Sequence, residues 1–227
     1  MFKIWNINVG DWDIIINGNY VNWNIIQGNG IIKTKEISLN NNSFSTINNI
    51  GSITVVVSNS DSNNKIEIEA ESNLLEYIEL NNKYWTLEIK IKDDISFSSK
   101  FWIKVYIYTN NNIENLKQIW SWDIIVKDIK NEEILNVEVS WSWDIILEWN
   151  FCIWDLDCNV NGSWGIDVSN NIIVEEANII VNWSWDITIW NVKETNIIIN
   201  GSWDVQVWED TNILNSVING SWDISRM

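Results

Sequence analysis

The sequence predicts an all-β fold in which a β-solenoid, built from coils of about twenty residues, follows a less regular β region. Three observations predict it. A four-residue motif, Gly or Trp followed by Ser-Trp-Asp, recurs through the second half of the chain. Short runs of Ile and Val lie between its copies, and no segment sustains the apolar period of a helix. Hydrophobic residues make up 46% of the 227 residues, so a large core can be buried.

The motif sets the period of the repeat. Its serines are separated by 21, 21, 21, 18 and 19 residues. In the third copy, Gly165 stands where the other copies have Asp. We expect the Ser and Asp side chains to bond neighbouring backbone N–H groups in a tight turn. These turn residues are Ser121, Asp123, Ser142, Asp144, Ser163, Ser184, Asp186, Ser202, Asp204, Ser221 and Asp223.

Between the motifs, the chain carries runs of three to six residues that are typical of strands. β-Branched side chains fit a pleated, half-buried surface. One coil cannot bury its apolar face alone, but stacked coils bury a continuous Ile/Val core with strands about 4.8 Å apart. We therefore assign 120–227 to solenoid repeats. Examples of the runs are Ile134–Val139, Ile145–Leu147, Ile172–Val174, Ile179–Val181 and Ile197–Ile199.

Residues 31–119 are predicted to form an N-terminal β region without the repeat. Apolar and polar residues alternate in its longer runs, as in Lys65–Glu69 and Ile103–Tyr108, which indicates sheets with one solvated face. The segment Ser72–Ile78 predicts a short helical turn with Ser72 or Asn73 as its cap. Residues 1–30 are a Gly/Asn-rich N-terminal segment.

Tryptophan is unusually frequent in this chain, and glycine is unusually rare. The chain has 18 Trp and only 9 Gly, although Gly averages about 7% of residues in proteins. The first slot of the motif holds Trp in three copies and Gly in three, and a tight-turn slot with positive φ resists a bulky residue. We hypothesise that most of these Trp are Gly in the native protein, through a UGA codon read as tryptophan in place of glycine. A real Trp ladder is the alternative.

With Trp read as Gly, the chain resembles the bacterial auto-transporter adhesins with a head GIN domain. The family's Gly-Ser-Gly-Asp-aliphatic signature is matched at five places. The segment Phe44–Val55 is similar to the family's opening segment, and Glu67–Leu75 is similar to a second signature. The resemblance covers roughly residues 30–227. The five matches are 120–124, 141–145, 183–187, 201–205 and 220–224.

This resemblance implies a right-handed β-solenoid and an adhesin or other surface-binding role. It also implies a location at the cell surface, in the periplasm or outside the cell. The segment Met1–Asn6 turns polar at once and lacks the apolar core of a signal peptide. The start of the sequence therefore indicates either an intracellular protein or a chain that is a fragment or has a misassigned start. This expectation differs from the location that the family resemblance implies.

Charge and composition exclude several functions. The formal net charge is −17, which disfavours nucleic acid because phosphate binding needs clustered Lys and Arg. The chain has no His, the commonest general base and metal ligand, so we expect no enzyme, cofactor or metal site. No run of eighteen apolar residues predicts a transmembrane helix. Cys152 and Cys158, six residues apart, would face one side of a strand, which predicts two buried free thiols.

The leading interpretation is a structural or adhesive domain that binds an unknown protein or glycan on a surface, with homo-oligomerisation left open. A carbohydrate-binding module is the alternative, because a Trp ladder could stack on sugar rings. A polysaccharide-acting enzyme is the weakest, with Asp155 and Asp157 as its nearest carboxylate pair. The stacked Asp residues of the turns could also attract a cation, but bonds to the turn backbone explain them more simply.

Overall fold

The computed structural model describes most of the chain as β-strand. The described residues are 14–16, 19–21, 25–39, 43–60, 64–120, 122–129, 133–141, 144–148, 152–162, 165–169, 172–182, 187–201, 205–220 and 224–226. The prediction of an all-β fold is confirmed, since the only helical element within these ranges is the 3-10 turn η1 (Leu75–Tyr77). No helix in the described ranges has the length and apolar character needed to cross a membrane.

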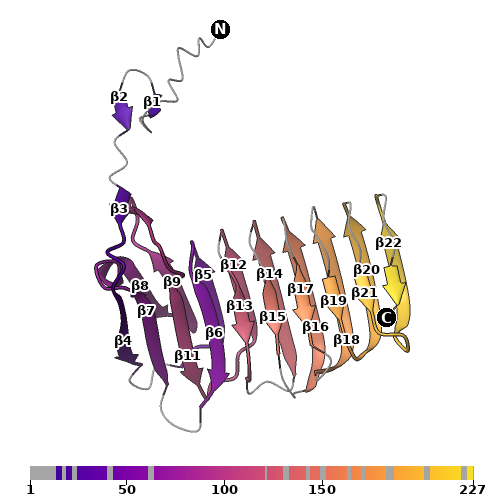
Figure 1. Ribbon diagram of the computed structural model, residues 1–227. Coiled ribbons are helices and arrows are strands. Elements are labelled where there is room, and N and C mark those ends of the chain that lie inside the picture. Colours follow the sequence, from indigo (N-terminus) through magenta and orange to yellow (C-terminus); the bar gives the residue numbers. More distant parts are fainter. Residues whose placement is uncertain are drawn as a thin grey trace.

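Two long sheets contain most of the strands (Figure 1). The ten-stranded sheet has the order β4 (Ile32–Ser38), β7 (Lys65–Glu71), β11 (Lys104–Thr109), β6 (Thr54–Asn59), β13 (Ile124–Val126), β15 (Ile145–Leu147), β17 (Ile166–Val168), β19 (Ile187–Ile189), β21 (Val205–Val207) and β23 (Ile224–Arg226). The nine-stranded sheet has the order β8 (Ile78–Lys83), β9 (Thr86–Ile91), β5 (Thr46–Ile50), β12 (Asn115–Ile119), β14 (Ile134–Ser140), β16 (Cys152–Asn161), β18 (Ile173–Asn182), β20 (Val192–Asn200) and β22 (Asn212–Ile218).

Two short pairs lie outside these sheets. Strand β1 (Ile14–Ile16) pairs with β2 (Asn19–Val21) in antiparallel orientation. Strand β3 (Ile25–Gln27) pairs in parallel with β10 (Ser96–Ser98), and this second pair lies beside the N-terminal end of the long sheets (Figure 1).

From β12 onward the chain alternates between the two long sheets, and each strand pairs in parallel with the strand one repeat unit later. Before it, β7 pairs with β4 and β11, and β8 pairs with β9, in antiparallel orientation. Ile124 pairs with Ile145, and Ile145 pairs with Ile166, each 21 residues further along. An offset equal to the sequence period places equivalent residues in straight columns across the stack. This parallel stacking also includes β5, β6, β9 and β11, which come from the region before residue 120.

Columns of aliphatic side chains fill the space between the sheets. In the ten-stranded sheet, one column runs through Val126, Leu147, Val168, Ile189 and Val207, all fully buried. A second buried column, in the nine-stranded sheet, runs through Leu116, Val137, Cys158, Ile179 and Ile197.

Both columns end on polar residues in the last unit. Ser216 pairs with Ile197, and Arg226 pairs with Val207. The Arg226 guanidinium donates to the carbonyl oxygens of Glu209 and Thr211, at 2.6 and 2.8 Å. A hydrogen-bonded guanidinium therefore stands where the preceding units place an aliphatic side chain.

The helical turn predicted over Ser72–Ile78 is present as η1, but the predicted cap is wrong. Leu74 occupies the cap position, and no side chain caps the helix. The Asn73 Oδ1 atom instead accepts a hydrogen bond from the backbone N–H of Asn29, at 3.0 Å. A long-range partner has therefore replaced the local bond that the sequence indicates.

The prediction of two buried cysteines is wrong for one of them. Cys158 is buried and Cys152 is exposed, and both are free thiols. Alternation along β16 breaks between Ile153 and Leu156, which are three residues apart yet both buried. The intervening shift moves Cys152 to the opposite face, because strand parity holds only where the pleat is regular. Burial raises the pKa of the Cys158 thiol, which makes it unreactive.

Candidate functional site

The recurring turn joins a strand of the nine-stranded sheet to the next strand of the ten-stranded sheet. Of the predicted turn residues, Asp123 and Asp144 are described. The Asp144 backbone N–H donates to Asp123 Oδ1 at 3.3 Å, and the Gly165 N–H donates to Asp144 Oδ1 at 2.8 Å. Each carboxylate thus bonds the backbone of the next unit. The six motif serines and Asp186, Asp204 and Asp223 lie outside the described residues.

Partial burial perturbs the acidic groups around this turn. Burial raises the pKa of Asp123, with a smaller contribution from the Asp144 charge, while the hydrogen bond from the Asp144 N–H lowers it. Burial likewise raises the pKa of Asp167, assisted by Asp144 and Glu148. The described residues contain no group of three or more Asp, Glu or Cys arranged to hold a metal ion.

The first slot of the motif has a backbone that favours glycine. Trp120 and Trp141 have φ values of 54° and 55°, and Gly162 has a φ of 138°. A Cβ atom on Gly162 would lie 2.6 Å from the Trp141 backbone nitrogen. A Cβ on Gly220 would overlap the Gly201 carbonyl oxygen. At Gly162 and Gly220, therefore, the successive turns approach one another more closely than a Cβ atom allows.

As written, the sequence places an aromatic pair on this corner of the stack. The Trp120 and Trp141 rings are stacked with centroids 5.7 Å apart and an interplanar angle of 10°. Their exposed fractions are 66% and 63%. Gly162 occupies the next position, so no third ring continues the stack there.

Two asparagine ladders run along the outer face of the nine-stranded sheet, and the sequence reasoning missed them. In ladder one, Asn136 donates to Asn115 and Asn196 donates to Asn178, at 3.2 and 2.9 Å. Ladder two has amide–amide distances of 2.8 Å throughout. The signal was present, because these asparagines recur with the period of the turn motif. Ladder one comprises Asn115, Asn136, Asp157, Asn178, Asn196 and Asn215, and ladder two comprises Asn161, Asn182, Asn200 and Asn219.

Asp157 is the one carboxylate in ladder one. Its Oδ1 accepts from Asn178 Nδ2 at 2.9 Å, but a carboxylate has no N–H to donate to Asn136. Asp155, on the same strand, pairs instead with Ile134 and Glu176. The two carboxylates considered for polysaccharide cleavage therefore sit in different columns of an outer sheet face.

We expect Asp157→Asn to stabilise the fold by about 1 kcal/mol, because its amide can complete the ladder to Asn136. Chemical denaturation at high salt checks this, since salt screens the effect of removing a charge. Asp155→Asn is the matched control, because it removes the same charge without adding a ladder bond. An equal gain from both variants at high salt would refute a role for the ladder.

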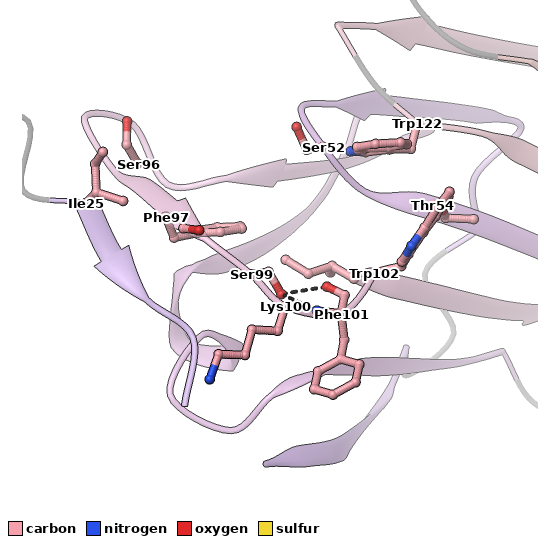
Figure 2. Close-up of a pocket in the computed structure, with 12 residues that line it drawn as sticks. Ile25, Ser52, Thr54, Ser96, Phe97, Ser99, Lys100, Phe101, Trp102 and Trp122 are labelled. Carbon is pink, nitrogen blue, oxygen red and sulfur yellow. Dashed lines mark hydrogen bonds between the residues drawn. The ribbon is translucent and has the colours of Figure 1, made fainter. Parts of the chain in front are cut away.

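A pocket of about 500 Å³ lies where the N-terminal strands meet the first repeat turn (Figure 2). Phe97, Trp102 and Trp122 form aromatic parts of its wall, and the Trp102 and Trp122 rings are 4.8 Å apart. Thr54 lines it and is 4% exposed, and its Oγ1 atom has no hydrogen-bond partner among the residues that the structure describes. The other lining residues are Ile25, Ser52, Ser96, Ser98, Ser99, Lys100, Phe101 and Ile103.

The parallel sheets, the recurring turn and the ladders together define an all-β repeat protein. The chain belongs to the family described as "Putative auto-transporter adhesin, head GIN domain", whose model matches residues 43–224. The family predicted from the sequence is thereby confirmed. No curated protein matches the chain.

Solved structures share this fold at low sequence identity. A putative adhesin from Bacteroides fragilis is 15% identical with a TM-score of 0.66, covering 89% of this chain and 100% of that chain. A putative adhesin from Parabacteroides distasonis is 16% identical with a TM-score of 0.57, covering 89% and 99%. A putative lipid binding protein from the same species is 18% identical with a TM-score of 0.53, again covering 89% and 99%.

Proposed function

We propose that the chain is a non-enzymatic adhesive module, a right-handed β-solenoid that binds a protein or glycan on a surface through the outer face of its nine-stranded sheet. The observation that carries the proposal is a row of exposed apolar side chains between the two asparagine ladders. Ile180, Ile198 and Val217 pair in register and are 38%, 38% and 48% exposed. Membership of an adhesin family supports the same role.

This face combines apolar and polar contacts over several repeat units. Ladder residues lie two positions before and two positions after each residue of the apolar row. In ladder two, Asn182, Asn200 and Asn219 each use one N–H for the preceding amide, and an amide has a second N–H that can reach solvent or a ligand. In ladder one, Asn136 and Asn196 also donate to the Glu114 carbonyl and the Glu176 carboxylate. An extended, regular array of this kind suits a long ligand or a flat surface better than a small molecule.

Binding of the purified chain to glycan arrays and to immobilised cell-surface protein tests the proposal. Ile198→Lys places a charge in the apolar row and should weaken binding at least tenfold. Thr188→Lys is the matched control, because Thr188 lies at the outward position of β19 in the opposite sheet. Equal binding by both variants would move the site away from the nine-stranded sheet.

We also propose that the tryptophans of the turn stand for glycine in the native protein. Trp85 supports this outside the motif, since its φ is 64° and follows a φ of 50° at Tyr84. Left-handed backbone costs a non-glycine residue about 1–2 kcal/mol. UGG codons at Trp122, Trp143, Trp164 and Trp185 in the gene would refute this proposal.

We expect Trp141→Gly to raise the free energy of unfolding by about 1 kcal/mol, because relief of the positive φ exceeds the loss of one exposed ring stack. Thermal denaturation measures the change. Trp154→Gly is the control, since Trp154 is also 63% exposed but lies within β16. Glycine weakens a strand interior, so this control should lose stability. A loss in both variants would contradict the glycine assignment at 141.

A carbohydrate-binding module is the second candidate, favoured by the stacked Trp120 and Trp141 rings. Aromatic faces of this kind can bind sugar rings. A glycan array separates the two candidates when the chain is made with Gly at both positions. Retained binding favours the polar and apolar sheet face, whereas lost binding favours the rings.

We further propose the division into an N-terminal segment over 1–30, a β region over 31–119 and solenoid repeats over 120–227. An adhesive role would place the chain at the cell surface, in the periplasm or outside the cell. Immunolabelling of intact cells tests the location.

A further inference from the structure

The segment 25–31 contacts the N-terminal end of the sheets through one buried carboxylate. Glu71, the last residue of β7, is fully buried. Its Oε1 accepts from the Gly30 backbone N–H at 2.5 Å. Its Oε2 accepts from the Ser99 hydroxyl at 2.7 Å and from the Lys100 backbone N–H at 3.0 Å. One side chain therefore joins three parts of the chain.

Other bonds hold the same segment along its length. The Gly28 N–H donates to the Ser98 carbonyl at 2.8 Å, and the Ser72 N–H donates to the Ile31 carbonyl at 2.7 Å. The Asn73 Nδ2 donates to the Gln27 carbonyl at 2.8 Å. All of these hydrogen bonds run to neighbouring strands and loops. The Glu71 carboxylate, in contrast, is buried beneath the segment.

Gly28 fits directly over this carboxylate. It is buried, and a Cβ atom there would overlap both oxygens of Glu71. The segment also contributes to the pocket, because Ile25 lines it on β3, beside the strand that carries Phe97 (Figure 2). Among residues 25–31, Ile25 is the one that borders the pocket.

We propose that residues 25–31 form a strap that the Glu71 carboxylate locks in place, and that release of this lock opens the pocket. A carboxylate is suited to this task because it accepts all three hydrogen bonds at once. A glutamine has a single acceptor oxygen and would direct an N–H group toward one of the donors. These three hydrogen bonds are partly buried, and placing an N–H group against one of their donors costs free energy, so the strap would detach.

The lock holds at neutral pH. The Ser99 hydroxyl lowers the pKa of Glu71, and so do the N–H groups of Gly30 and Lys100 and the Lys100 ammonium, while burial acts in the opposite direction. A lowered folded-state pKa means that the stabilisation is complete above the unfolded-state value and is lost as the pH falls through the lower folded-state value. The strap should therefore stay closed at neutral pH and open only in acid, as the pH falls below the ordinary range of a glutamate carboxyl.

Hydrogen exchange at neutral pH, followed at the Gly28 and Gly30 amides, tests the lock. We expect Glu71→Gln to reduce their protection at least tenfold while the strands β14 to β20 keep theirs. Gly28→Ala should do the same by a steric route. Glu69→Gln is the control, since Glu69 lies two residues earlier on β7 and pairs with Thr34 and Lys104 in the ladders on either side.

Opening of the pocket has its own readout. Binding of 1-anilinonaphthalene-8-sulfonate, an anionic dye that fluoresces on apolar surface, should increase at least threefold in Glu71→Gln and remain unchanged in Glu69→Gln. Three results would overturn the proposal: protection retained at both glycines in Glu71→Gln, unchanged dye binding in that variant, or an equal loss of protection throughout β14 to β20. None of these readouts depends on adhesion, so the strap and the proposed function can fail separately.

Discussion

Replacing Gly162 with alanine is expected to destabilise the fold by about 3 kcal/mol. Two effects combine at this turn. The φ of 138° is strained for any residue with a Cβ, at a cost of about 1–3 kcal/mol. The new methyl would also lie 2.6 and 2.8 Å from the backbone N and Cα of Trp141, where relief requires adjacent units to separate. Chemical denaturation of the two proteins measures the loss.

Two other glycines separate these effects. Gly51 has a φ of 99° with only the Ile91 side chain nearby, at 3.4 Å, so Gly51→Ala reports backbone strain alone. At Gly220 the added methyl would overlap the Gly201 carbonyl, so Gly220→Ala reports close approach. Gly162→Ala should exceed Gly51→Ala by at least 1 kcal/mol. Equal losses would mean that the spacing of the turns does not constrain the stack.

Leu147→Ala is expected to cost about 3 kcal/mol by creating a cavity in the centre of the stack. Leu147 is fully buried, and its strand β15 pairs with β13 on one side and β17 on the other. Truncating a buried leucine loses transfer free energy and leaves a void, together worth about 2–5 kcal/mol. Denaturant titration followed by circular dichroism measures the change.

The neighbouring residue provides the control. Ile146 precedes Leu147 on β15 and points to the outer face, where it is only partly buried. Ile146→Ala removes a similar apolar volume, but from a position that is only partly buried. It should therefore cost less than half as much as Leu147→Ala. A larger loss at Ile146 would indicate that the outer face, and not the space between the sheets, contributes most to stability.

The repeat architecture could be predicted from the sequence because each unit carries the same local information. Constant motif spacing and short Ile/Val runs together predict parallel stacking, and the columns through Leu147 and Val137 realise it. The contact between residues 25–31 and the N-terminal end of the sheets could not be predicted in this way. It depends on Glu71, whose partners at Gly30 and Ser99 lie 41 and 28 residues away in sequence.

The candidate site was predicted only in part. The sequence predicts that the motif carboxylates bond N–H groups within one turn, whereas Asp123 and Asp144 accept from the backbone of the following unit, 21 residues away. The asparagine ladders were not predicted, because clusters of asparagine usually indicate loops. Only the recurrence of these asparagines with the period of the turn motif indicates that they share one face of a sheet. Cys152 illustrates a different limit of sequence reasoning. One irregular step in β16 exchanges the inward and outward faces of the strand, so a prediction that Cys152 and Cys158 share a face fails.

A stack of near-identical units has no intrinsic length, because each unit offers the next the same surface that it received. Arg226 changes that surface. A second copy of the stack that docked on β23 would have to strip water from a guanidinium already bonded to the carbonyl oxygens of Glu209 and Thr211. The charge of Arg226 therefore opposes end-to-end association of two copies at this strand.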